Sequence, residues 1–253
     1  MTGCARAGGL DIGSRTVKLV VVEADGSVAL SRLLETTPDL LGDLRALVEE
    51  AGCASLVVTG YGRALAEVAF DATSVTEIKA VARGAEAVHP GCGTVVDIGG
   101  QDTKVVVLDG SGRVARFEMN DRCAAGAGRF LEIMAGALRY GLDEFGPAGL
   151  RGADTVTLSS MCAVFAESEV VGLMTRGRAR EDIARAVHRA IAGRTAGMVR
   201  RASPEGPVLF AGGGARNPCL AAFLSEALGR PLAVPPDPQM VSARGAALMA
   251  LGR

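Results

Sequence analysis

Short apolar runs rich in β-branched residues recur along the chain, and turns rich in Gly, Asp and Ser separate them. Residues 10–22 contain one apolar run that ends in Asp-x-Gly, then a polar turn, then a second β-branched run, which predicts a β-hairpin. A third strand is expected after Asp25-Gly26, and helical spacing of apolar residues follows at 39–51. The first part of the chain therefore reads as three strands covered by a helix.

The same pattern occurs a second time at residues 96–108. Asp, Ile, Gly and Lys recur at matching positions, and Asp97 lies 86 residues after Asp11. A third strand is expected after residues 110–112, and a helix near 124–140. Because such a repeat indicates two copies of one unit, the sequence predicts two β-rich halves that are covered by helices and face one another.

The hairpin turns carry residues suited to phosphate and Mg²⁺. Glycine permits backbone dihedrals that let successive N–H groups point at phosphate oxygens. Asp11 and Asp97 stand at strand ends beside the turns, where carboxylates can hold a hydrated Mg²⁺, so they are the candidate catalytic residues. The candidate phosphate-binding residues are Gly13, Ser14, Arg15, Thr16, Gly99, Gly100, Gln101 and Asp102. Two ordinary glycine hairpins are the alternative, but recurrence with matched flanks favours phosphate binding.

A third glycine cluster lies between an apolar run at 208–210 and a helical pattern at 218–228. A strand, a glycine turn and a helix in this order allow close approach of a nucleotide. The candidate adenosine-side residues are Gly212, Gly213, Gly214 and Asn217. Together the three clusters resemble the phosphate and adenosine motifs of the superfamily of actin, heat-shock chaperones and sugar kinases. The resemblance implies an α/β protein of two ribonuclease-H-like lobes, at 1–90 and 91–253, with ATP in the cleft between them.

Composition narrows the functions to consider. The chain has 253 residues, of which 49% are hydrophobic, and a net charge of −1, so it shows no electrostatic footprint for nucleic acid. No apolar run approaches the ~20 residues that cross a bilayer, and residues 1–9 lack the apolar stretch of a signal peptide. We therefore expect a cytoplasmic protein without a membrane or nucleic-acid partner. Two His and 4% aromatic residues argue against a multi-His metal site and base-stacking platforms.

Two of the six cysteines have a distinctive setting. The chain has no CxxC pair, so the ordinary interpretation is reduced, mostly buried thiols. Cys123 and Cys162, however, each stand near the start of a helical pattern, where partial positive charge lowers the pKa of a thiol and favours a thiolate bound to an iron–sulfur cluster. A four-iron cluster normally needs four thiolates, so a two-fold dimer could share one cluster between the two pairs. Buried thiols remain the alternative.

Four segments carry a more specific resemblance, which spans nearly the whole chain. Residues 59–63, 97–104, 120–132 and 159–170 resemble signature blocks of the ATPase activators of 2-hydroxyacyl-CoA dehydratases and of the related ATPase subunits of benzoyl-CoA reductases. The resemblance implies a homodimer, or a heterodimer with a like subunit, that holds one 4Fe-4S cluster between its Cys123 and Cys162 pairs. It also implies ATP hydrolysis that drives an electron from ferredoxin or flavodoxin to an acyl-CoA dehydratase or reductase component.

Two other classes of protein fit the same scaffold. A small-molecule kinase, such as a sugar kinase, needs a carboxylate near the acceptor hydroxyl, and Asp121 or Asp102 could serve. The matched cysteines would then be idle. A switch or polymer subunit that only binds nucleotide is the other class, but the chain is short for the insertions that make filament contacts.

Overall fold

The computed structural model describes residues 6–122, 127–159, 162–202, 204 and 206–252. Within these ranges it has two five-stranded mixed sheets, each in the order third, second, first, fourth and fifth strand of its half. The first sheet is built from β1 (Ala7–Ile12), β2 (Thr16–Val22), β3 (Val28–Glu35), β4 (Ser55–Gly60) and β5 (Thr73–Ser74). The second is built from β6 (Thr94–Ile98), β7 (Thr103–Leu108), β8 (Val114–Asn120), β9 (Val208–Ala211) and β10 (Leu232–Ala233).

The two sheets repeat one another in register as well as in order. Asp11 is paired with Lys18 across the first hairpin, and Asp97 with Lys104 across the second. In both sheets the first strand also pairs in parallel with the fourth. A register shift interrupts the pairing of the second and third strands at the equivalent place, after Val21 and after Val107. The repeat in the sequence is therefore a structural repeat.

Two helices cover the outer face of the first sheet. They are α1 (Leu40–Ala51) and α2 (Arg63–Phe70). Helix α1 begins where the Asp39 side chain accepts a hydrogen bond from Gly42 N, and it ends at Gly52 in the left-handed region. Leu44 and Leu47 of α1 pack on alternate residues of β1 and β2 to form the apolar core of this half.

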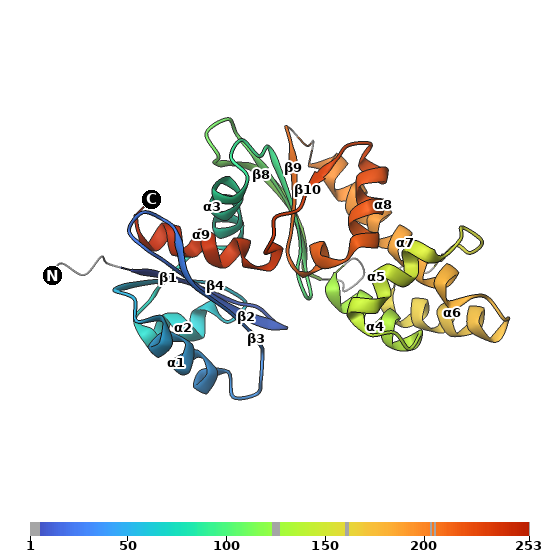
Figure 1. Cartoon of the computed structure of the whole chain (residues 1–253), viewed down its shortest axis with the longest axis horizontal. Coiled ribbons are helices and arrows are strands. Elements are labelled where there is room, and N and C mark those ends of the chain that lie inside the picture. Colours follow the sequence, from blue (N-terminus) through green and yellow to red (C-terminus); the bar gives the residue numbers. More distant parts are fainter. Residues whose placement is uncertain (1–5, 123–126, 160–161, 203, 205, 253) are drawn as a thin grey trace.

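Two further helices, α3 (Glu77–Val88) and α9 (Val241–Ala250), lie between the sheets (Figure 1). The C-terminal helix α9 packs on β1, β2 and β4, and α3 contacts β6, β7 and β8. They cross closely, because a Cβ on Gly84 would lie 1.9 Å from Val241 O and one on Gly245 would lie 1.8 Å from Ala80 O. The C-terminal helix thus returns to the first sheet, and the division at 90/91 stays a prediction.

The second half carries the larger helical layer. It comprises α4 (Gly128–Ala137), α5 (Leu142–Arg151), α6 (Ala163–Thr175), α7 (Arg180–Arg201) and α8 (Pro218–Leu228), with 3-10 turns η1 (Gly213–Arg216) and η2 (Pro238–Met240). Side chains of α4, α5, α7 and α8 form its core with β6, β7 and β9. Figure 1 shows α4 and α6 at the end of the molecule farthest from the first sheet.

Helices expected from the sequence at 39–51 and 218–228 are present as α1 and α8. The helix expected after Cys162 is α6. The helix expected near 124–140 is shorter, because α4 ends at Ala137 and Arg139 adopts φ +58°, a left-handed turn that leads into α5; residues 124–126 lie outside the described ranges.

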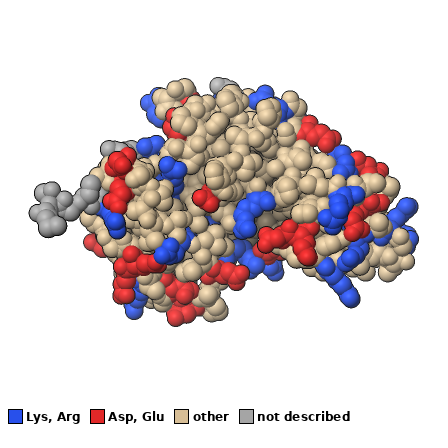
Figure 2. All heavy atoms as spheres, in the orientation of Figure 1, with Lys and Arg blue, Asp and Glu red and all other residues tan. Residues whose placement is uncertain are grey.

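The surface carries charges of both signs. Figure 2 shows Lys and Arg interspersed with Asp and Glu over the face that it presents. Among the described residues, no helix combines the length and the apolar character that a membrane crossing demands.

Candidate nucleotide-binding site

A cavity of about 360 Å³ lies between the two halves, at the turns of the two hairpins. Every residue that the sequence assigned to ATP or Mg²⁺ lines it: Asp11, Gly13, Ser14, Arg15, Thr16, Asp97, Gly99, Gly100, Gln101, Asp102, Gly212, Gly213, Gly214 and Asn217. Three separate segments therefore meet at one site, although their roles there stay predictions.

The two hairpin turns have one backbone geometry. Gly13 N donates to Thr16 O over 3.0 Å, and Gly99 N donates to Asp102 O over 2.9 Å. A Cβ on Gly99 would lie 2.3 Å from Asp102 Oδ1. Glycine is thus required for the turn to hold this carboxylate beside it.

A glycine at the end of the neighbouring parallel strand packs against each aspartate. Gly212, after β9, has φ +81°, and a Cβ there would lie 2.2 Å from Asp97 Oδ1. Gly60, at the end of β4, has φ +92°, and a Cβ there would lie 2.7 Å from Asp11 Oδ1. Sequence reasoning did not recognise Gly60 as the counterpart of Gly212, although the apolar run before each glycine was a usable signal.

Asp11 in the first half is held by a single ion pair. Its side chain is 7% exposed, and Lys18 Nζ lies 3.1 Å from its Oδ2. Lys18 therefore neutralises Asp11 when no cation is bound, and a divalent cation at Asp11 would compete with the ammonium group.

The equivalent lysine in the second half is surrounded by carboxylates. Lys104 is 2% exposed, and its Nζ lies 2.6 Å from both Glu77 Oε2 and Asp102 Oδ2. Burial alone would lower the pKa of Lys104, but Asp97, Glu77 and Asp102 outweigh it and raise that pKa. Sequence reasoning missed Glu77, which stands at the start of α3 and carries no local motif.

Asp97 is the candidate residue most affected by its surroundings. It is 6% exposed, and burial raises its pKa to about 6, against the opposing charge of Lys104. A bound cation would favour the ionised form. Asp97 can therefore hold a cation or exchange a proton near neutral pH.

Helix α4 is tied to both hairpin turns. Gly128 N donates to Gly99 O over 2.8 Å, and Arg129 N donates to Gly100 O over 2.7 Å. From the other side of the cavity, Arg15 Nε lies 3.0 Å from Glu132 Oε1. A ligand that moves either turn therefore acts on α4 directly.

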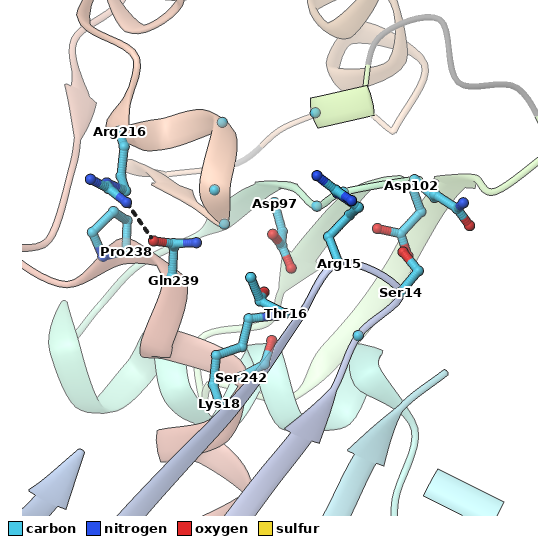
Figure 3. Close-up of a pocket in the computed structure, with 18 of the residues that line it drawn as sticks. Ser14, Arg15, Thr16, Lys18, Asp97, Asp102, Arg216, Pro238, Gln239 and Ser242 are labelled. Carbon is cyan, nitrogen blue, oxygen red and sulfur yellow. Dashed lines mark hydrogen bonds between the residues drawn. The ribbon is translucent and has the colours of Figure 1, made fainter. Parts of the chain in front are cut away.

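The opposite side of the cavity is formed by η1 and η2. Arg216 Nη1 donates to Gln239 Oε1 over 3.2 Å, beside Pro238 (Figure 3). In Figure 3 these three residues lie across the cavity from Ser14 and Asp102, with Asp97 between the two groups. The site therefore has a carboxylate-lined end and a separate end that could receive a nucleoside.

The described cysteines differ in exposure. Cys92 and Cys219 are buried, as the ordinary interpretation expects, and burial raises the pKa of Cys219 to about 12. Cys162 is exposed and occupies the N-cap position of α6, so it is not a buried thiol. Cys123 lies outside the described ranges. Within those ranges no three His, Cys, Asp or Glu side chains are grouped so as to hold a metal ion.

The fold and the cleft define an ATPase of the actin, heat-shock chaperone and sugar kinase class. A glucokinase of Streptomyces griseus, solved with glucose and AMPPNP, superposes with a TM-score of 0.62 at 14% identity over 98% of this chain and all of its own, a likeness of fold alone. More specifically, the model of the BadF/BadG/BcrA/BcrD ATPase family matches residues 9–250. The chain belongs to this family, and the two-lobed fold and the family expected from the sequence are confirmed.

Relatives within the family are similar over nearly their full length. The 2-hydroxyisocaproyl-CoA dehydratase activator of Clostridioides difficile is 36% identical, covering 96% of this chain and 93% of the relative. One of the benzoyl-CoA reductase subunits of Thauera aromatica is 32% identical, covering 95% and 91%. The structure of (R)-2-hydroxyglutaryl-CoA dehydratase component A of Acidaminococcus fermentans superposes with a TM-score of 0.92 at 33% identity, covering 98% of each chain.

Proposed function

We propose that this protein is an ATP-hydrolysing activator that delivers an electron to a partner enzyme acting on an acyl-CoA. The observation that carries the ATPase half is the meeting of two glycine turns, each with a buried aspartate, across one cavity. The names of the family relatives support the activator half. The electron donor would be a ferredoxin or a flavodoxin, as the resemblance implies.

We assign the two ends of MgATP to the two ends of the cavity. The turns at 13–16 and 99–102 would hold the phosphates, and Asp11 and Asp97 would position Mg²⁺. The glycines at 212–214 would lie against the nucleoside. Carboxylates that draw Mg²⁺ to the phosphates stabilise the charge that develops during phosphoryl transfer to water.

The chemistry of Cys162 fits a ligand of a 4Fe-4S cluster. Its exposed thiol stands at a helix N-terminus, which favours the thiolate. Val164 and Phe165, 68% and 69% exposed, lie beside it and offer apolar surface for a second chain to cover. A dimer would supply four thiolates from Cys123 and Cys162 of each chain, and the group so held would supply one electron at low potential.

Helix α4 would couple the two ligands. Its first turn is joined to the second hairpin turn through two backbone hydrogen bonds, and Glu132 contacts the first hairpin turn through Arg15. The segment that contains Cys123 immediately precedes α4 in the sequence. A change of nucleotide at the turns would therefore reach the cluster-binding segment through one helix.

A small-molecule kinase is the second candidate. Asp121 and Asp102 both line the cavity, so a carboxylate is available to an acceptor hydroxyl. The exposed Cys162 would then have no role. ATP consumption that depends on an added sugar, without iron in the protein, would favour the kinase.

The cysteines provide the test. We expect anaerobically purified protein to contain four irons per two chains, and Cys162→Ser to lose the iron and the visible absorbance. Cys53→Ser, which changes a partly buried thiol away from the cavity, is the matched control and should keep both. Full iron and an unchanged spectrum in Cys162→Ser would contradict the bridging assignment.

A further inference from the structure

His188 and Asn217 form a polar pair within the apolar core of the second half. His188, on α7, is completely buried, and Asn217, just before α8, is 8% exposed at the wall of the cavity. His188 Nε2 lies 2.9 Å from Asn217 Nδ2, and His188 Nδ1 lies 2.7 Å from Ala184 O. The pair therefore connects the core to the cavity.

These contacts fix both side chains in one arrangement. A carbonyl oxygen only accepts, so Nδ1 of His188 carries the proton and Nε2 accepts from the amide nitrogen of Asn217. The amide oxygen of Asn217 is then turned the other way, where it accepts from Leu220 N over 3.0 Å and caps α8. A flipped Asn217 amide would place oxygen against the Nε2 lone pair and lose both bonds.

Helix α5 packs directly on the pair. A Cβ on Gly146 would lie 2.7 Å from Asn217 Oδ1, and one on Gly149 would lie 2.8 Å from His188 Nδ1. The Phe145 ring centroid lies 4.5 Å from that of His188. Three helices thus hold the pair, and a polar pair in an apolar core is tolerated only when its hydrogen bonds are made.

We propose that His188 is a positioning residue for the nucleoside end of the cavity, acting through the orientation of the Asn217 amide. Asn217 follows the turn at 212–214 and lies on the side of Arg216 and Gln239, away from the carboxylate end. By fixing Asn217, His188 fixes the start of α8 and the wall that the base and ribose would contact. This inference rests on the proposed nucleotide function and concerns its base and ribose, not its phosphates.

His188→Phe tests the proposal, because it keeps an aromatic ring against Phe145 but removes the acceptor for Asn217. Leaving a buried donor unpaired is expected to weaken ADP binding about tenfold, whereas pyrophosphate, which lacks a nucleoside, should bind as it does to wild type. In ATP hydrolysis KM should rise by a similar factor with kcat unchanged. His188→Gln, whose amide both donates and accepts, should restore ADP binding.

Asn217→Ser is the second variant, in case His188→Phe does not fold. A serine hydroxyl still caps α8 but is too short to reach His188. The same loss of ADP affinity without loss of pyrophosphate affinity is expected. ADP binding at the wild-type level in both variants, or an equal loss for both ligands, would overturn the proposal. Wild-type protein that binds neither ligand would instead overturn the nucleotide function itself.

Discussion

The hairpin at Asp11 and the hairpin at Asp97 share a register and a turn hydrogen bond, yet opposite charges surround them. Asp11 is accompanied by Lys18 and by Arg15, which also lines the cavity. Around Asp97, a single lysine is surrounded by Asp102 and Glu77. Duplication kept the backbone while the side chains diverged, so the first copy is suited to an anion and the second to a cation. A magnesium–phosphate ligand needs both.

The largest expected effect separates the two lysines. Lys104→Met leaves buried carboxylates without their counter-charge and should reduce the free energy of unfolding by about 3–5 kcal/mol. Lys18→Met removes one partly exposed pair and should cost about 1 kcal/mol or less. Urea denaturation of the nucleotide-free protein measures both. Equal losses would show that the two copies do not differ in this way.

Acid sensitivity should also belong to the second half. Burial lowers the pKa of His188 from 6.5 to about 4. Because the unfolded chain then takes up a proton first, His188 contributes stability above pH 6.5 that is lost as pH falls towards 4, at most roughly 3 kcal/mol. His188→Gln should remove this part of the pH dependence of unfolding, and His89→Gln, at a partly exposed position, should not. Parallel curves for both variants and wild type would contradict the assignment.

Hydrolysis should distinguish the two aspartates. If the second copy holds the cation, Asp97→Asn should lower kcat for MgATP about 100-fold, and Asp11→Asn about tenfold, since a metal-bound carboxylate stabilises charge in the transition state. Steady-state phosphate release measures the change, and unaltered melting temperatures would show that the fold is kept. Undiminished turnover in both variants would reject the cleft as the site of hydrolysis.

The smallest effect concerns the ion pair that crosses the cavity. Arg15 is paired with Glu132 in this structure, so a phosphate must compete with Glu132 for the guanidinium. Glu132→Gln should therefore tighten ATP binding about two- to fivefold, the range of an exposed pair, whereas Arg15→Gln should weaken it. Calorimetry with a non-hydrolysed ATP analogue measures both. Weaker binding in Glu132→Gln would mean that Glu132 orients Arg15 for phosphate.

The sequence predicted what its own repetition marks. The offset between Asp11 and Asp97 identified both hairpins, and the late glycine cluster identified the third wall of the cavity. Contacts between remote segments left no such mark: Glu77 meets Lys104, and Arg15 meets Glu132, only because the two halves face each other. The return of α9 to the first sheet was missed for the same reason, since helix periodicity shows an apolar face but not the surface that covers it.

The crossing of α3 and α9 has a mechanical consequence. Because Gly84 and Gly245 place backbone against backbone, no side chain stands between the helices to change rotamer or be compressed. Motion there is restricted to turning about a fixed point, as at a fulcrum. Both helices also start at the cavity, where Glu77 and Val241 line its wall. A small rotation at the glycines is therefore multiplied at the carboxylate end, in proportion to its distance along each helix from the crossing.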